Sequence, residues 1–205
     1  MEANNFKPFK HSQIKKWSKQ ILQGLKIIHK RGYVHSDLKP ENIMMTCNDK
    51  GEPDDAKIAD FGLTSKIGIP YEPDGTINYM SPEELNLFND IYYDPAMDMW
   101  AFGCIVYELA NGHPPFDSGN QREIVNNINI VKRNESDYIT LTKTPFLLDF
   151  INHLLVKDTN IRMTAEQALI HPWITEEVGV KPDPDLYIEI NIRNNERLDR
   201  EEKRK

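Results

Sequence analysis

The sequence predicts a mainly α-helical fold with one or two short β-hairpins. A long amphipathic helical pattern begins near Ser12, and a turn-rich segment at residues 48–55 separates two short strand-like runs. A third observation is the almost wholly apolar segment at residues 98–111, which Gly112 closes. With 205 residues, of which 39% are hydrophobic, the chain can bury the core of one sizeable domain, or of part of one followed by a tail.

The first predicted helix starts at Ser12, whose hydroxyl can cap the free N–H groups of the first turn. Its apolar side chains recur at helical spacing, so they share one face of the helix. This face consists of Ile14, Trp17, Ile21, Leu25 and Ile28. We expect the helix to end near Gly32.

Two short strands follow, at residues 42–46 and 56–59. Asn, Asp, Gly and Pro dominate residues 48–55 between them, and this composition predicts a hairpin. Residues 63–80 are punctuated by Gly and Pro, which indicates an ordered loop.

The second half of the chain is predicted to be helical. Residues 98–111 form its most apolar helix, which ends at Gly112 and the pair Pro114 and Pro115. Further helices are expected at residues 119–129, 145–156 and 164–170. The last 30 residues are charged and interrupted by Pro, which favours a solvated helix or a disordered tail.

Composition excludes several classes of partner and location. The net charge of −7 gives no reason to expect nucleic acid or an anionic membrane as a partner. The longest apolar stretch, residues 102–110, contains Glu108 and is too short to span a bilayer, and the N-terminus lacks the pattern of a signal peptide. Cys47 and Cys104 form neither a disulfide framework nor a metal cluster, which fits a reducing cytoplasm or nucleus.

Two motifs indicate the chemistry. Residues 35–42 read His-Ser-Asp-Leu-Lys-Pro-Glu-Asn, and residues 60–62 read Asp-Phe-Gly. They place carboxylate, ammonium and amide groups where a nucleoside triphosphate, metal ions and a hydroxyl nucleophile could meet. The pair resembles the catalytic loop and the metal-binding loop of eukaryotic protein kinases, although Ser36 stands where Arg is usual.

The resemblance implies a role for each polar residue. Asp37 matches the catalytic base, and Lys39 matches the Lys that contacts the transferred phosphate in serine/threonine kinases. Asn42 and Asp60 match the ligands of Mg²⁺, which prefers hard oxygen donors. Met44 would form the floor under the adenine of ATP. A single Asp, Lys or Asn is usually a surface or capping residue, but the spacing of the whole set argues against that interpretation.

Downstream motifs extend the resemblance. Residues 75–83 resemble the end of the kinase activation segment, in which Thr76 typically hydrogen-bonds the catalytic Asp and Lys. Asp98 matches the Asp that begins the central helix and holds the backbone of the catalytic loop. Arg162 matches the Arg that forms a buried ion pair with Glu83, and such a pair is costly unless both partners are present.

The resemblance covers roughly residues 6–175, and it implies the helical C-terminal lobe of a kinase. Nothing upstream of residue 35 supplies a Gly-rich loop, a strand Lys or its partner Glu, so we expect the β-rich N-terminal lobe of the α+β kinase fold to be missing. The expected division is an N-terminal remnant, the kinase domain and a charged tail, at residues 1–11, 12–175 and 176–205. A groove without its upper lobe should bind ATP poorly and expose apolar surface.

Two departures from the family pattern concern regulation and specificity. Ser36 cannot receive an activation-loop phosphate, and the usual phosphorylation position holds Glu72, with only Tyr71 nearby able to take a phosphate. Glu41 and Glu108 match two acidic positions that basophilic kinases use to bind an Arg near the acceptor. The alternative is that Glu41 is merely the commonest residue at its place and Glu108 belongs to a buried network.

Two hypotheses for function remain. The first is a partial serine/threonine protein kinase domain, which transfers the γ-phosphoryl of Mg-ATP to Ser or Thr of protein substrates. This kinase would have a basophilic preference if Glu41 and Glu108 both bind an Arg of the substrate. The second is a non-catalytic, kinase-like interaction module, a pseudokinase. A small-molecule kinase of the aminoglycoside type is excluded because that class lacks a segment like residues 75–83 and the scaffold of Asp98 and Arg162. The kinase subgroup, the substrate and the oligomeric state stay open.

Overall fold

The computed structural model describes residues 7–72, 74–86, 90–133, 137, 141 and 144–175. Helices dominate this part of the chain, and two small antiparallel sheets accompany them. The helices are α1 (His11–Lys30), α2 (Pro95–Asn111), α3 (Gln121–Asn129), α5 (Pro145–Leu154), α6 (Ala165–Leu169) and α7 (Pro172–Thr175), with 3₁₀ turns η1 (Pro40–Asn42) and η2 (Ile77–Tyr79). One sheet pairs β1 (Tyr33–Val34) with β4 (Ser65–Lys66), and the other pairs β2 (Ile43–Cys47) with β3 (Pro53–Ile58).

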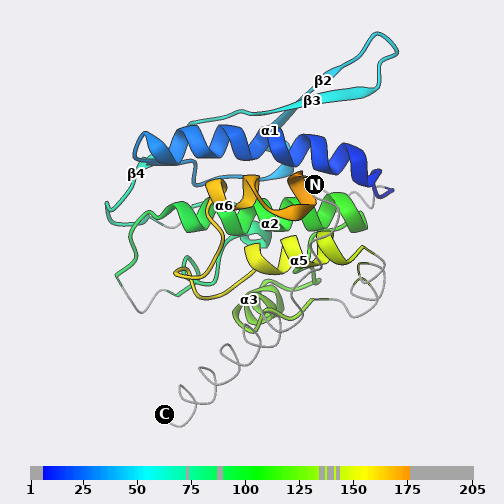
Figure 1. Cartoon of the computed structure of the whole chain (residues 1–205). Coiled ribbons are helices and arrows are strands. Elements are labelled where there is room, and N and C mark those ends of the chain that lie inside the picture. The colour runs from blue at the N-terminus through cyan, green and yellow to red at the C-terminus, as the bar shows by residue number, and fades with distance from the viewer. Residues whose placement is uncertain are drawn as a thin grey trace.

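The elements form layers (Figure 1). The β2–β3 hairpin lies on one side of α1 and projects beyond it, while α2 and α6 lie on the other side. Helix α5 packs against α2, and α3 lies farther out. The hydrophobic core therefore forms around α2, between α1 and α5.

Helix α1 buries the predicted face, but it begins one residue before Ser12. Its N-cap is Lys10, which makes no side-chain capping bond. The buried residues are Ile14, Trp17, Ser18, Ile21, Leu22 and Leu25, and Ile28 packs on their edge. The helix ends at Lys30, close to Gly32, whose φ of 82° lies in the left-handed region that Gly adopts readily.

The predicted hairpin is confirmed, with strand bounds set by α1. Strand β3 begins at Pro53, inside the segment that composition assigns to the turn. The indole of Trp17 donates to the carbonyl of Asp54 at 2.8 Å, and Gln20 both donates to the Asp55 carboxylate at 2.6 Å and accepts from the Ala56 N–H at 2.9 Å. These tertiary bonds hold the two Asp residues in extended backbone.

Helix α2 is the central helix, and it begins earlier than the sequence predicts. Asp94 caps it by accepting the Ala96 N–H at 2.7 Å, and Pro95 occupies the first turn, so Asp98 lies inside the helix. Gly112, at a φ of 89°, ends the helix where it was expected. Nearly every side chain of α2 is buried because the helix packs on several sides.

The other predicted elements differ in detail. Helix α5 ends at Leu154 and α6 is a short helix, while the ordered loop at residues 63–80 contains β4 and η2. Ahead of α1, Phe9 donates its N–H to the Leu109 carbonyl at 3.0 Å. The predicted tail lies outside the described residues, and within them no helix combines the length and the apolar character needed to cross a bilayer.

Close packing between α2 and α5 yields a test of the core. A Cβ atom at Gly103 would lie 2.9 Å from both Leu154 Cβ and Leu155 Cδ2, a separation that side chains do not tolerate. Gly103→Ala should therefore force α2 and α5 apart and lower the free energy of unfolding by about 1–3 kcal/mol. Chemical denaturation followed by circular dichroism measures this change.

Gly119→Ala is the matched control. Gly119 is exposed and no described atom lies within 4 Å of the added Cβ, so its variant should unfold like the wild type. Equal midpoints for the two variants would contradict the close approach of α2 and α5.

Candidate active site

The catalytic loop is built on the buried carboxylate of Asp98. Asp98 is 1% exposed and accepts the backbone N–H groups of His35 at 2.8 Å and Ser36 at 3.0 Å. It also lies 2.7 Å from the Nε2 atom of His29, at the end of α1. Ser36 has a φ of 72°, a left-handed conformation that is strained for a residue other than Gly. The two bonds from Asp98 hold this strained turn in place.

Asp37 follows the strained turn, and two side chains orient its carboxylate. The Lys39 ammonium donates to both oxygens, at 3.0 and 2.7 Å. The Asn42 amide donates to the Asp37 carbonyl at 2.7 Å and to Oδ2 at 2.9 Å. The Asp37 side chain is 12% exposed, so it faces a partly desolvated site in which it can accept a proton.

Asp60 is held near Asn42 by the backbone hydrogen bond of its neighbour Ala59. The Ala59 N–H donates to the Asn42 carbonyl at 2.9 Å, and the Ala59 carbonyl accepts from His35 Nε2 at 3.0 Å. Asp60 has a φ of 57° and is exposed, and its Oδ1 accepts the Gly62 N–H at 3.2 Å. Asn42 and Asp60 thus offer hard oxygen atoms from adjoining segments, and such atoms suit Mg²⁺.

Exposed apolar side chains surround these polar groups. Met44, on β2, is 63% exposed, and Phe61, next to Asp60, is 53% exposed. The Phe61 ring meets the edge of the His35 ring at a centroid distance of 5.3 Å. This apolar surface is available to a planar ligand or to another polypeptide segment.

Thr76 lies near Asp37 without the expected hydrogen bond. In the described part of the chain its hydroxyl bonds neither Asp37 nor Lys39, and the hydrogen bonds to the Asp37 carboxylate come from Lys39 and Asn42. Thr76 and Asp37 instead line a small cavity of about 20 Å³, enough for about one water molecule.

The end of this segment is fastened by Glu83 and Arg162. Arg162 donates to Glu83 through Nη1 at 2.6 Å and Nη2 at 3.0 Å, a bidentate arrangement. It also donates to the carbonyls of Val156 at 2.8 Å and Ala96 at 2.7 Å, and its guanidinium lies 5.1 Å from the centroid of the Trp100 ring. The Arg162 side chain is fully buried, whereas 20% of the Glu83 side chain is exposed, so only the Arg162 member of the pair is completely buried.

These motifs occupy a stretch that known proteins share. Residues 2–174 match the family model of the protein kinase domain. The chain belongs to the protein kinase family. The resemblance stated from the motifs is confirmed, and the mainly helical structure with small sheets is consistent with part of a kinase domain.

The chain is similar to several serine/threonine kinases. It is 36% identical to serine/threonine-protein kinase 17A of Oryctolagus cuniculus over 180 residues, which are 85% of this chain and 43% of that protein. It is 38% identical to death-associated protein kinase 2 of Mus musculus over 164 residues, 77% of this chain and 42% of that protein. It is 37% identical to the calcium/calmodulin-dependent protein kinase type II alpha chain of Drosophila melanogaster over 168 residues, which are 78% of this chain and 30% of that protein. The chain thus spans less than half the length of these relatives.

Glu41 and Glu108 lie in different environments. Glu108, on α2, is buried and accepts from the Tyr79 hydroxyl at 2.6 Å. Burial raises the pKa of its carboxyl, and the negative charges of Glu41 and Asp117 raise it further. Glu41 is exposed. The two carboxylates therefore influence one another, and Glu108 also belongs to a buried network.

Motif comparison overlooks a second buried acid, Glu84. Its Oε2 accepts the N–H of Ser81 at 2.7 Å and the hydroxyl of Ser81 at 2.6 Å, and its Oε1 accepts the Tyr71 hydroxyl at 3.1 Å. Burial raises the pKa of Glu84 to about 7, although the Ser81 donors oppose this shift. The signal in the sequence is Ser81, whose hydroxyl supplies one of the hydrogen bonds to Glu84.

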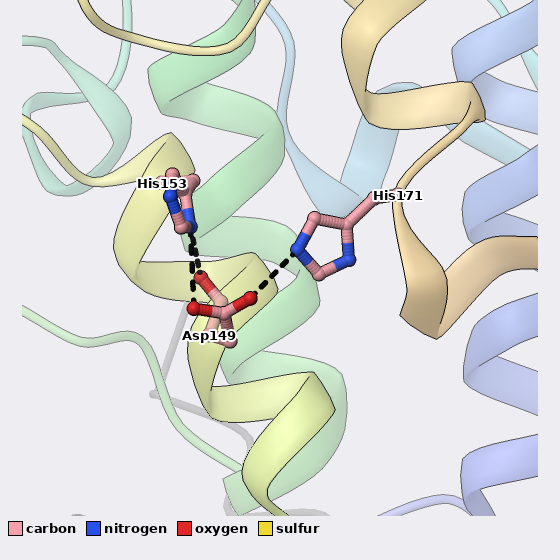
Figure 2. Close-up of side chains that lie close together, drawn as sticks. All are labelled: Asp149, His153 and His171. Atoms are coloured by element: carbon pink, nitrogen blue, oxygen red, sulfur yellow. Dashed lines mark hydrogen bonds and ion pairs between the residues drawn. The ribbon is translucent and has the colours of Figure 1, made fainter. Parts of the chain in front are cut away.

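A cluster outside the catalytic loop has the composition of a metal site. Atoms of Asp149, His153 and His171 that could bind an ion lie within 4.8 Å of one another, and both imidazoles point at the carboxylate (Figure 2). His171 Nε2 lies 2.9 Å from Asp149 Oδ2, while its Nδ1 accepts the Trp173 N–H at 3.2 Å. Nε2 must therefore carry a hydrogen and donate it to Asp149.

His153 leads to the same conclusion. Its Nδ1 lies 2.9 Å from the Asp149 carbonyl, which can only accept, so this nitrogen also carries a hydrogen. A metal ion needs the lone pairs of both nitrogens. The cluster is better explained as a set of hydrogen bonds that ties α5 to the residues before α7.

The half-buried ion pair gives a stability test. Arg162→Ala would leave Glu83 without its partner and would remove the bonds that Arg162 donates to the carbonyls of Val156 and Ala96. The free energy of unfolding should fall by about 3–5 kcal/mol, as it does when one member of a buried pair is removed. Urea denaturation measures the loss.

Lys16→Ala is the matched control for a lost ion pair. Lys16 bonds Asp54 and Asp55 at the exposed base of the hairpin, where solvent screens the charges. The urea midpoint of Lys16→Ala should barely differ from that of the wild type. An Arg162→Ala midpoint as high as that of Lys16→Ala would show that the Glu83 pair contributes nothing.

Glu84 predicts a dependence of stability on pH. Its folded-state pKa of about 7 exceeds the ordinary value of 4.5, so the folded chain binds more protons between these values than the unfolded chain does. The free energy of unfolding should therefore fall as pH rises through this window, by up to about 3 kcal/mol from this group alone. Glu84→Gln should remove that part of the fall, as urea midpoints at pH 5 and pH 8 would measure. Identical pH profiles for variant and wild type would rule out the effect.

Proposed function

We propose that the chain is the C-terminal lobe of a serine/threonine protein kinase, with the kinase domain at residues 12–175, that transfers the γ-phosphoryl of Mg-ATP to Ser or Thr of protein substrates. The observation that carries this proposal is the Asp37 carboxylate. It is oriented by Lys39 and Asn42 and mounted on a loop that Asp98 holds. A scaffold protein has no chemical need for this arrangement.

Asp37 would orient the acceptor hydroxyl and take its proton as the phosphoryl group arrives. Its two donors, Lys39 and Asn42, aim the carboxylate in one direction. Lys39, at 2.7 Å from Asp37, carries the positive charge nearest the reacting groups. When the γ-phosphate is present, the Lys39 ammonium can swing to it and compensate the negative charge that develops there.

Asn42 and Asp60 fit a magnesium site. Asn42 donates through its amide nitrogen to Asp37, which leaves its Oδ1 atom for a cation. The exposed Asp60 carboxylate contributes the negative charge. Mg-ATP would supply the phosphoryl group and the charge compensation at its phosphates. The exposed side chain of Met44 would contact the adenine from below.

The acceptor is inferred from two observations. Lys39 is typical of kinases that act on Ser or Thr, and the similar proteins named above are serine/threonine kinases. A preference for Arg near the acceptor is favoured by the interacting carboxylates of Glu41 and Glu108, since a guanidinium would relieve their repulsion. The hydrogen bond from Tyr79 to Glu108 supports the competing structural role.

The second candidate function is a non-catalytic interaction module. The observation that favours it is the exposed apolar surface of Met44 and Phe61 beside the site. Such a surface can bind a protein segment as well as a nucleotide. The intact set of Asp37, Lys39, Asn42 and Asp60 favours the kinase.

Amide substitutions test the proposal. In a longer protein that contains this chain and shows Mg-ATP-dependent transfer, Asp37→Asn should lower kcat by roughly 10²–10⁴ through loss of the base. Asp60→Asn should abolish transfer by removing the charged metal ligand, and the 205-residue chain by itself should transfer little. Transfer of labelled phosphate to Ser and Thr peptides measures each outcome.

Asp49→Asn, in the exposed turn of the hairpin, is the matched control and should keep full activity. Phosphatase treatment should also leave activity unchanged, because Ser36 offers no cation to an activation-loop phosphate. Wild-type rates in both site variants would exclude the kinase mechanism. Absence of transfer together with tight binding of a protein to Met44 and Phe61 would favour the interaction module.

A further inference from the structure

Residues 65–71 are hydrogen-bonded on both sides. On one side β4 pairs with β1, and the Ile67 N–H donates to the Gly32 carbonyl at 3.0 Å. On the other side the bonds run from Gly68 N–H to Tyr93 O at 2.9 Å, from Tyr93 N–H to Ile69 O at 3.0 Å and from Tyr71 N–H to Ile91 O at 2.8 Å. The first half of the activation segment is thus hydrogen-bonded on both sides, around a turn at Gly68, whose φ of 81° is left-handed, and Tyr71 is the last residue in this ladder.

Tyr71 turns its side chain inward at the end of the ladder. Its ring packs edge-on against Tyr93 at a centroid distance of 5.1 Å. Its hydroxyl donates to Glu84 Oε1 at 3.1 Å. The bond joins the middle of the activation segment to its end, because Glu84 directly follows the Glu83 that pairs with Arg162.

Glu84 is an unusual partner for the Tyr71 hydroxyl because it is a buried acid, of which only 6% is exposed. In the described part of the chain its hydrogen bonds come from neutral donors, Ser81 and Tyr71, and no Lys or Arg forms an ion pair with it. A buried carboxylate needs every donor it can reach. Loss of the Tyr71 hydroxyl would leave one Glu84 oxygen without a donor.

The same carboxylate borders the catalytic loop. Glu84 lines the cavity of about 20 Å³ that Ser36, Asp37 and Gly75 also line. An added Cβ at Gly75 would lie 3.6 Å from Asp37 Oδ1, so the chain between Tyr71 and Glu84 passes close to the proposed base. The short side chain of Ser36 turns to its own loop and donates to the Val34 carbonyl at 3.3 Å. Within the described residues, the Ser36 hydroxyl therefore forms no hydrogen bond to the activation segment.

We propose that Tyr71 is a positioning residue that holds the activation segment against the catalytic loop through its hydrogen bond to Glu84. The proposal rests on the function proposed above, since the segment matters only if Asp37 acts on a substrate. The Tyr71–Glu84 bond and the Glu83–Arg162 pair would then fix both ends of residues 71–83 without any phosphate. Phosphorylation of the Tyr71 oxygen would remove the donor and place negative charge beside Glu84, so it would release the segment.

Hydrogen exchange of the 205-residue chain tests the anchor without requiring activity. In Tyr71→Phe, the amides of Gly68, Tyr71 and Tyr93 should exchange about tenfold faster than in the wild type, because a hydrogen bond to a charged group is lost. The Ala56 amide, bonded to Gln20, should keep its rate. Tyr92→Phe is the matched control, because Tyr92 is 51% exposed on the same ladder. Equal exchange in Tyr71→Phe and Tyr92→Phe would overturn the proposal.

Two substitutions of Glu84 separate the hydrogen bond from general packing. In Glu84→Gln, the amide oxygen can accept from Ser81 and the amide nitrogen can donate to the Tyr71 oxygen, so exchange should stay at the wild-type rate. Glu84→Leu removes the bond from Tyr71 together with both bonds from Ser81, so exchange should be at least as fast as in Tyr71→Phe. If the Leu variant does not fold, the Gln variant decides, and fast exchange in it would contradict the geometry.

The transfer assay supplies the functional readout. In a protein with activity, Tyr71→Phe should lower kcat severalfold and leave the KM for ATP unchanged, because Asn42 and Asp60 are not touched. Faster exchange with an unchanged kcat would overturn the positioning role. If no protein containing the chain transfers phosphate, the proposed function fails, while the exchange rates still decide whether Tyr71 anchors the segment.

Discussion

The catalytic loop depends on the carboxylate of Asp98, which lies in the first turn of α2 and is almost fully buried. A charge in such a place is costly unless donors surround it, and here two backbone N–H groups and one imidazole do so. The same bonds hold Ser36 in a left-handed conformation that it would not adopt by itself. The direction in which Asp37 points is therefore decided by a residue about 60 positions away in the chain.

A second fastening reaches the same turn of α2. Arg162 donates to the Ala96 carbonyl as well as to Glu83, so the end of the activation segment and the start of α2 share one guanidinium. Arg suits this place because its planar group presents several donors at once, and here it also stacks on the apolar face of Trp100. The catalytic loop and the end of the activation segment are thus both attached to the first turn of α2, through Asp98 and Ala96. The apolar side chains of α2 hold that helix in the core.

The activation segment combines strong and weak attachments. Its middle and its end meet at two adjacent glutamates, of which Glu83 is paired with a cation and Glu84 with neutral hydroxyls. A carboxylate without a cation is the less stable of the two, which is why its pKa lies near neutrality. The attachment through Glu84 therefore responds to pH.

Local patterns in the sequence determined much of the fold and of the chemistry. Apolar spacing predicted the buried face of α1 and the central helix α2, and turn residues predicted the hairpin, because these features depend on neighbours along the chain. Motif spacing also identified Asp37, Lys39, Asn42 and Asp60 as candidates. Only the tertiary structure decided which atoms meet: Lys39 and not Thr76 on Asp37, α1 on the start of β3, and Tyr71 on Glu84. The physical reason is that burial and hydrogen bonding arise between segments distant in sequence, where periodicity and local propensity carry no information.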